Sequence, residues 1–86
     1  MDFEFDPAKS AANKRKHGMD FEEAQRIWDD DNRLEIVAPS LKEQRHAVVG
    51  MIDGKYWTAI VTYRSSRIRL ISVRRARELE IACYEG

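Results

Sequence analysis

The chain has 86 residues, which is enough for one small domain (residues 1–86) whose single core is only marginally sufficient. Its one cysteine excludes a disulfide framework and a cysteine-based metal site, and no segment resembles a signal peptide or a membrane span, so we expect a soluble cytoplasmic protein. The net charge is zero, but the two halves of the chain differ in charge. Residues 1–43 hold 11 acids and 7 bases (−4), whereas residues 44–86 hold 4 acids and 8 bases (+4). This asymmetry suggests that the second half binds an anion.

Phe3 and Phe5 alternate with acidic residues, a period typical of a short strand over residues 2–5. Asp6 is a favoured N-cap and Pro7 fits the first helical position, so a helix is predicted from residue 7 to about residue 16. Gly18 is a natural C-terminal stop for this helix. The stripe expected to face the sheet comprises Ala8, Ala11 and Ala12.

A second helix is predicted to begin after Asp20, because Glu23 completes an Asp-x-x-Glu capping box. Its apolar stripe comprises Phe21, Ala24, Ile27 and Trp28. The three carboxylates at residues 29–31 should end this helix, since negative charge is unfavourable at a helix C-terminus. They lack the alternate spacing and the glycine of a calcium loop, so a solvated turn is expected. Residues 34–37 are predicted to form another strand, ended by Pro39, with a candidate mobile linker over residues 39–44.

The stretch from residue 45 to residue 73 contains three apolar runs rich in β-branched residues, separated by Asp53-Gly54 and by the weaker turn signal Ser65-Ser66. Asp-Gly is favoured in two-residue hairpin loops because both positions tolerate positive φ. Two-residue loops would fix the register of an antiparallel meander. The expected pairs are Ile52 with Lys55, Val48 with Ala59, Tyr63 with Ile68, and Val61 with Leu70.

Alternation along the strands sorts the side chains of this meander onto two faces. The first face is apolar enough to be the floor of a core and comprises His46, Val48, Gly50, Ile52, Trp57, Ala59, Val61, Tyr63, Ile68, Leu70 and Ser72. One half of the second face is apolar, with Ala47, Val49, Met51, Ile60, Ile71 and Val73. The other half, named here the arginine surface, comprises Arg45, Arg64, Arg67 and Arg69 around Thr62.

The arginine surface should contain one cross-strand row of Arg45, Thr62 and Arg69, with Arg64 and Arg67 one step further out. Like charges placed side by side repel and destabilise a sheet. A bound anion would relieve this repulsion, and RNA phosphate is the obvious candidate. The alternative is a solvated sheet face whose arginines pair with acids from elsewhere in the chain.

The last segment, residues 74–84, is predicted to form a C-terminal helix. Its apolar stripe of Ala76, Leu79, Ala82 and Cys83 is expected to cover the apolar half of the second face, while the two N-terminal helices cover the first. The predicted fold class is therefore α+β, with two N-terminal helices packed on a twisted, mainly antiparallel β-sheet (the meander of residues 45–73) and a C-terminal helix.

Several motifs follow one another along almost the whole chain: FEFDPAK at residues 3–9, Asn13, KHG at residues 16–18, DFEEA at residues 20–24, Arg45 and Gly50. The most specific is IRLISVRRA at residues 68–76, followed by Glu80 and Tyr84. In this order and spacing they resemble the BrnT family, the toxins of bacterial type II toxin–antitoxin pairs. Val73 stands where the family usually has alanine, and the linker around residues 38–44 is shorter than in many members.

This resemblance implies a RelE-like ribonuclease fold, RNA cleavage that needs no cofactor and no metal, and neutralisation by the antitoxin BrnA. Since that antitoxin carries a ribbon-helix-helix DNA-binding dimer, the resemblance also implies complexes with two copies of each chain. Such complexes would bind operator DNA only via the antitoxin.

Metal-free RNA cleavage by the ribose 2′-OH needs a base at that hydroxyl, an acid at the 5′-oxygen and cations on the phosphate oxygens. We expect a charge-dominated catalytic set of Arg45, Arg64 and Arg69, with His17 as the acid–base candidate. The residues expected to position the RNA are Lys16, Arg67 and Arg74. Glu78 and Glu80 are further possible bases, Glu80 also being a candidate partner for an arginine. His46 and Tyr63 are left out because they fall on the core face.

Two of these residues, Lys16 and His17, allow a structural explanation as well, because they and their basic neighbours would oppose the negative end of a helix dipole. Two other functions also stay open. One is a non-catalytic nucleic-acid or antitoxin-binding module on the same fold, and the other is a protein-interaction domain whose arginines meet an acidic partner. Salt dependence would separate these two, since phosphate contacts make RNA affinity fall steeply with salt.

Overall fold

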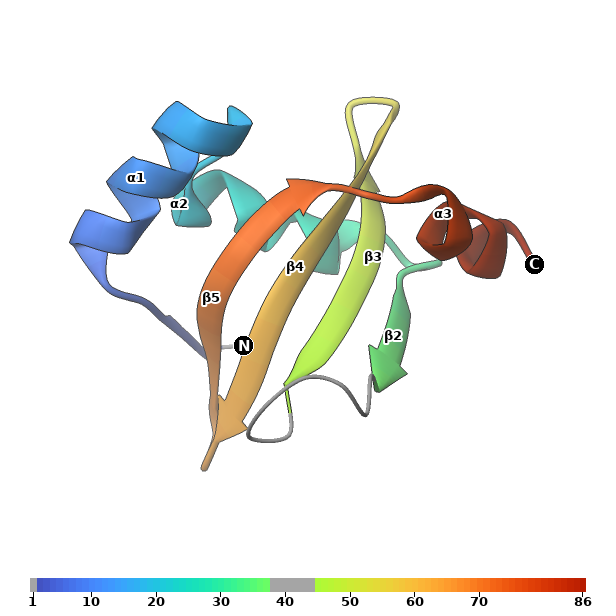
Figure 1. The fold of residues 1–86 in the computed structure, drawn as a ribbon. Coiled ribbons are helices and arrows are strands. Elements are labelled where there is room, and N and C mark those ends of the chain that lie inside the picture. The colour runs from blue at the N-terminus through green and yellow to red at the C-terminus, as the bar shows by residue number, and fades with distance from the viewer. Residues whose placement is uncertain (1, 38–44) are drawn as a thin grey trace.

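A computed structural model describes residues 2–37 and 45–86, which contain a mixed five-stranded sheet of order β1-β5-β4-β3-β2 (Figure 1). Its strands are β1 Asp2–Glu4, β2 Leu34–Val37, β3 His46–Ile52, β4 Lys55–Arg64 and β5 Arg67–Arg75. The helices are α1 Pro7–His17, α2 Phe21–Ala24 with its 3₁₀ continuation η1 Gln25–Asp29, and α3 Glu78–Glu85. β1 is parallel to β5 and the other neighbouring strands are antiparallel, so the predicted α+β class is confirmed.

The end of the strand at Pro39 and the linker over residues 39–44 lie outside the described residues. Among the helices of the described ranges, none is both long and apolar enough to cross a lipid bilayer.

Helix α1 begins and ends at the predicted signals. The Asp6 carboxylate accepts a hydrogen bond from Ala8 N at 2.8 Å, and Gly18 ends the helix with a left-handed φ of 84°. The prediction of an alanine stripe against the sheet is wrong: Ala8, Ala11 and Ala12 are exposed. The helix instead buries Ser10 and Asn13, because their polar atoms have backbone partners there.

Asn13 fastens α1 to the edge of β5. Its Nδ2 donates to Met19 O at 2.7 Å and to Val73 O at 2.8 Å, and its Oδ1 accepts from Val73 N at 3.3 Å. β1 pairs with β5 only as far as Arg69. Beyond that point the strand edge would present unpaired backbone groups, and the Asn13 amide satisfies them as a neighbouring strand would.

The second helix has the predicted capping box and apolar stripe but a different form. Asp20 accepts from Glu23 N at 2.8 Å, and Glu23 accepts from Asp20 N at 3.0 Å. After Ala24 the chain tightens into η1, whose Ile27 lies against β3: a Cβ added at Gly50 would come within 2.9 Å of Ile27 Cγ2. The glycine therefore allows the close approach of η1 to the sheet.

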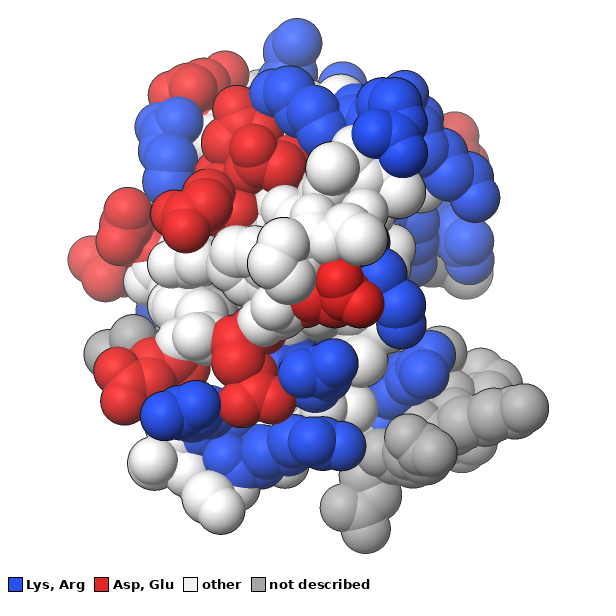
Figure 2. All heavy atoms as spheres, turned by 90° about the vertical axis from the view of Figure 1, so that its left-hand side faces the viewer, with Lys and Arg blue, Asp and Glu red and all other residues white. Residues whose placement is uncertain are grey.

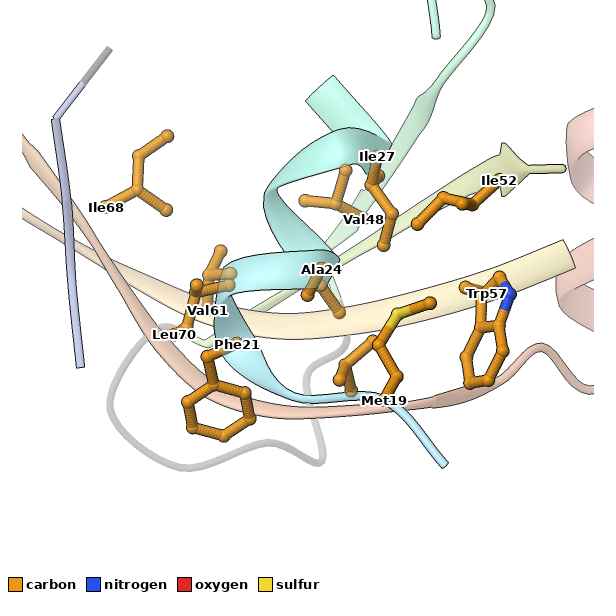
Figure 3. Packing of buried hydrophobic residues seen from close by; sticks show 12 residues of the cluster. Met19, Phe21, Ala24, Ile27, Val48, Ile52, Trp57, Val61, Ile68 and Leu70 are labelled. Carbon is orange, nitrogen blue, oxygen red and sulfur yellow. The ribbon is translucent and has the colours of Figure 1, made fainter. Parts of the chain in front are cut away.

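The core lies between α2–η1 and the first face of the sheet (Figure 3). Phe21, Ala24 and Ile27 point toward the strands, and Trp28 packs at the margin of the cluster. The predicted sheet residues buried opposite them include Val48, Ile52, Trp57, Ala59, Val61, Ile68 and Leu70. The predicted pairs of the meander are confirmed from Ile52–Lys55 to Tyr63–Ile68, and Asp53 and Gly54 have the positive φ values, 50° and 79°, that their turn requires.

A β-bulge overturns the predicted register of the end of β5. Val61 lies opposite Leu70, but Ile60 lies opposite Ser72, so Ile71 is an extra residue. Because one extra residue shifts the alternation, the side chains beyond it change faces. Val73, predicted on the second face, is fully buried in the core on the first.

The C-terminal helix differs from the prediction in its start and in its orientation. β5 continues to Arg75, so α3 begins only at Glu78 rather than at residue 74. Leu79 is 82% exposed, and Ala82 and Cys83 are also exposed, so the expected apolar stripe faces outward. The inward side instead carries hydrogen-bonding groups: Tyr84 OH donates to Asp30 Oδ2 at 2.6 Å, and Glu80 contacts Thr58 on the second sheet face.

Asn13→Ala should lower the free energy of unfolding by about 1–3 kcal/mol, since it leaves backbone groups of Met19 and Val73 buried without partners. Urea unfolding followed by circular dichroism measures the change. Asn32→Ala, in an exposed turn, is the matched control and should differ little from the wild type. Equal stability of the two variants would contradict a structural role for the Asn13 amide.

Candidate functional site

The arginine surface lies at the end of the sheet where β4 turns into β5, at the bottom of Figure 1. Thr62 is opposite Arg69 and Arg64 is opposite Arg67, as predicted. Arg45 directly precedes β3, whose first residue pairs with Val61. Continuing that pairing by one residue brings the backbone of Arg45 beside Thr62, the position expected from the sequence.

A single carboxylate from β1 enters this surface. Glu4 lies 3.1 Å from the nearest guanidinium nitrogen of Arg69 and 3.8 Å from that of Arg67. Among the described residues, Nε of Arg45 is buried without a hydrogen-bond partner. Arg64 and Arg67 are exposed. The alternative of arginines neutralised by acids from elsewhere therefore holds for Arg69 and partly for Arg67. Counted over the described residues, the surface keeps an excess of positive charge.

The structure does not bring His17 and Lys16 to the arginine surface. Both end α1, and one turn earlier Asn13 contacts Val73, in the part of β5 furthest from Arg67. Figure 1 shows the C-terminal end of α1 near the arrowhead of β5, opposite the β4–β5 turn. In Figure 2 basic side chains lie along the top, the right-hand side and the lower part of this face, around a central area of uncharged and acidic surface.

Arg74 is also separate, because it is engaged in an ion pair on the second face. Two of its nitrogens lie 2.8 Å from the two carboxylate oxygens of Glu80. The hydrogen bond from the Arg74 guanidinium lowers the pKa of Glu80 to about 2. Burial of the carboxylate opposes this shift, while hydrogen bonds from Arg77 N and the Thr58 hydroxyl add to it. Glu80 is thus the partner of an arginine, as the sequence suggested, and Arg74 joins β5 to α3.

A second group of chemically active side chains lies at the same end of the sheet but on its first face. Tyr63 OH donates to Glu35 Oε1 at 2.6 Å. His46 Nδ1 is 2.9 Å from Glu35 Oε2, an ion-pair distance without hydrogen-bond geometry. The rings of His46 and Tyr63 meet edge to face with centroids 4.9 Å apart. These three residues are named here the Glu35 cluster.

The sequence did not predict the Glu35 cluster, because alternation along a strand indicates which face of the sheet a side chain lies on but not how deeply it is buried. His46 and Tyr63 do belong to the first face, as predicted, yet Tyr63 is 43% exposed, and the side chains of Glu35 and His46 are 44% and 21% exposed. Burial and the bond to Glu35 raise the pKa of Tyr63, so its hydroxyl is protonated at neutral pH. The available signal was the position of His46 and Tyr63 at the strand ends, furthest from the predicted helices.

A depression of about 330 Å³ elsewhere has the wrong charge for RNA. Its lining includes Asp29, Asp30 and Asp53. The one arginine in that lining, Arg26, is paired with Asp53 at 2.8 Å. Within the residues that the structure describes, no three histidine, cysteine or carboxylate groups are arranged to hold a metal ion.

The chain is similar to a known protein family. The family model of the ribonuclease toxin BrnT, of type II toxin–antitoxin systems, matches residues 5–80. The matched range includes the arginine surface and the Glu35 cluster, whereas Glu4 precedes it. No curated protein matches the chain.

Glu80→Gln should destabilise the fold in a pH-dependent way. The pKa of Glu80 in the folded protein, about 2, is below its ordinary value of 4.5. The ionised group therefore stabilises the fold above about pH 4.5, and this contribution is lost as the pH falls toward 2. Urea unfolding at pH 7, 4 and 2.5 should show a deficit of the variant at pH 7 that shrinks with acid.

Glu78→Gln is the matched control, because Glu78 is exposed on the first turn of the same helix. It should not reproduce the pH-dependent deficit. A Glu80→Gln deficit that stays constant from pH 7 to 2.5 would contradict the ion pair with Arg74.

Proposed function

We propose that this chain, which belongs to the BrnT family of ribonuclease toxins of type II toxin–antitoxin systems, cleaves RNA in the cytoplasm without a metal ion. The ribose 2′-OH would attack the adjacent phosphorus, and the resulting loss of RNA would inhibit growth. The observation that supports this proposal is the arginine surface, where Thr62 and Arg69 face each other across β4 and β5 at an exposed end of the sheet.

The proposed role of these arginines is electrostatic. A guanidinium presents planar donors that match phosphate oxygens, and preorganised donors stabilise the charge that develops on phosphorus. Arg45 and Arg69 would clamp the scissile phosphate from either side of Thr62. Arg64 would add charge to this catalytic set, and Arg67 would hold the neighbouring backbone. Glu4 supports such a role because its contact orients Arg69 while leaving other guanidinium donors for the phosphate.

The residues at the other end of the sheet take no part in this proposed site. His17 and Lys16 lie at the end of α1, and the nitrogens of Arg74 are occupied by Glu80. The same family relationship supports the proposal of a RelE-like fold, in which a strand and two helices precede an antiparallel meander.

The proposed partner is a BrnA-type antitoxin, with two copies of each chain in the complex and operator DNA bound only via the antitoxin. Two surfaces suit such a partner: the arginine surface, and the outward apolar stripe of α3 formed by Leu79, Ala82 and Cys83. Burying arginines without partners is costly, so the antitoxin must bring carboxylates to them. One segment that combines acidic and apolar residues would meet both requirements.

Purified protein incubated with total RNA should cleave it in the presence of EDTA. The fragments should carry the 2′,3′-cyclic phosphate that attack by the 2′-OH leaves behind, which end-group analysis detects. Cleavage that vanishes with EDTA and returns with magnesium would contradict the metal-free mechanism. RNA that binds but stays intact would instead indicate a non-catalytic binding module.

Arg69→Ala should abolish toxicity and reduce RNA cleavage by about 10²-fold or more, as does the loss of other preorganised donors. The melting temperature should change little, because a half-exposed ion pair such as Arg69–Glu4 contributes about 0–1 kcal/mol. Growth on induction, a cleavage assay and thermal unfolding check the three quantities. Arg15→Ala, an exposed arginine on α1, is the control, and a fully toxic Arg69→Ala protein would refute the phosphate clamp.

The complex with the antitoxin should protect Arg45, Arg64 and Arg69 from an arginine-specific reagent such as a dicarbonyl. It should also melt at a higher temperature than the toxin alone, because a partner that binds the folded state stabilises it by mass action. Modification followed by mass spectrometry compares the free and bound chains. Equal reactivity of these arginines in both states would mean that inhibition proceeds by another route.

A further inference from the structure

The structure assigns a general base that the arginine surface itself lacks: we propose that His46 accepts the proton of the ribose 2′-OH, with Glu35 as its positioning residue. This inference rests on the proposed function and names the acid–base centre of the same site. It stands on the contacts of the Glu35 cluster, in which one carboxylate meets the imidazole at 2.9 Å and the Tyr63 hydroxyl at 2.6 Å.

The two nitrogens of His46 have different surroundings. Nδ1 is buried and lies 2.9 Å from Glu35 Oε2. A carboxylate beside one ring nitrogen favours the tautomer that carries its proton there, which leaves the lone pair of Nε2 for proton abstraction. This contact lacks hydrogen-bond geometry, and catalytic hydrogen bonds commonly tighten in the reacting complex.

Tyr63 holds the carboxylate in place from the other side. Its hydroxyl donates to Glu35 Oε1, and its ring packs edge to face against the imidazole. Since the pKa of Tyr63 is raised, the phenol keeps its proton and remains a donor. Each of the three side chains comes from a different strand of the sheet, so their meeting depends on the pairing of β2, β3 and β4.

The Glu35 cluster and the arginine surface lie on opposite faces of the same strand ends. Arg45 directly precedes His46 in the chain, and Tyr63 stands between Thr62 and Arg64. Adjacent residues of a strand point to opposite faces, a few ångströms apart along the chain. The two sets of side chains therefore point apart, and the RNA strand would have to pass round this end of the sheet, with a phosphate on the arginines of one face and the neighbouring ribose against His46 on the other.

The proposed step transfers one proton and exchanges one P–O bond. Nε2 of His46 takes the proton of the 2′-OH as the 2′-oxygen forms a bond to phosphorus. The P–O5′ bond breaks, and the 5′-oxygen leaves with its electron pair and takes a proton from water. The products are a 2′,3′-cyclic phosphate and a 5′-hydroxyl, and the imidazolium returns its proton to the solvent.

His46→Ala should cleave a labelled RNA oligonucleotide about 10²–10⁴-fold more slowly than the wild type, the usual contribution of general acid–base catalysis. The loss should appear in kcat, with KM nearly unchanged. Added imidazole should restore part of the rate to His46→Ala, because the small molecule can occupy the vacated position. Imidazole should restore much less in the double variant His46→Ala/Glu35→Gln, which lacks the carboxylate that orients it.

Matched variants separate this assignment from a structural effect. Tyr56→Phe removes another tyrosine hydroxyl that contacts a carboxylate, that of Glu85, outside the Glu35 cluster, and should keep wild-type cleavage. Circular dichroism and thermal unfolding establish that each variant is folded. If His46→Ala does not fold, His46→Gln serves in its place, with kcat and KM as the readout.

The outcomes distinguish a failure of this inference from a failure of the proposed function. Wild-type cleavage in EDTA together with equal cleavage by a folded His46 variant would overturn the role of His46 alone. Loss of activity in His17→Ala rather than in the His46 variant would do the same and return the acid–base role to α1. Absence of cleavage by the wild type would overturn the ribonuclease function and this assignment with it.

Discussion

One extra residue in β5 determines how the two halves of this strand are used. The bulge at Ile71 separates a segment that carries Arg67 and Arg69 on the second face from a segment that places Val73 in the core. Val73 then offers its backbone groups to Asn13 and so fixes the position of α1. The same change of face sets Arg74 beside Thr58 and Glu80, which fixes α3. The docking of α1 on β5 and the ion pair that joins β5 to α3 thus both follow from a local irregularity of the strand.

The charges of the molecule divide into a structural set and an unbalanced set. Lys14 with Glu23, Arg26 with Asp53 and Arg74 with Glu80 are close pairs at 2.8 Å that join neighbouring elements. At the arginine surface one carboxylate, Glu4, contacts two guanidinium groups. Repulsion of this kind lowers stability unless an anion binds, so the imbalance among the described residues fits the proposed binding of phosphate.

The exposed end of the sheet is a consequence of the size of the chain. α1 docks near Val73, and η1 crosses the strands at Gly50, so the described helices cover the first face only as far as Val61 and Ile68. Beyond these residues the same alternation continues with His46 and Tyr63, which are partly exposed and share the Glu35 carboxylate. A small domain with few helices leaves strand ends uncovered, and among the described residues this end contains the cations and the titratable groups that the proposed RNA cleavage would use.

Local signals in the sequence determined the elements and most of the register. These signals act through the backbone of neighbouring residues, so their effects were predictable without knowledge of the rest of the chain. They are the helix caps Asp6, Gly18 and Asp20 and the turn Asp53-Gly54. The tertiary structure decided three other features: the face of the sheet on which Val73 lies, the ion-pair partner of Arg74 and the outward orientation of Leu79. Each of these depends on a bulge or on a hydrogen bond between residues distant in sequence, and alternation within one strand contains no information about either. The Glu35 cluster belongs to the same class, because its carboxylate comes from β2 and its imidazole and phenol from β3 and β4.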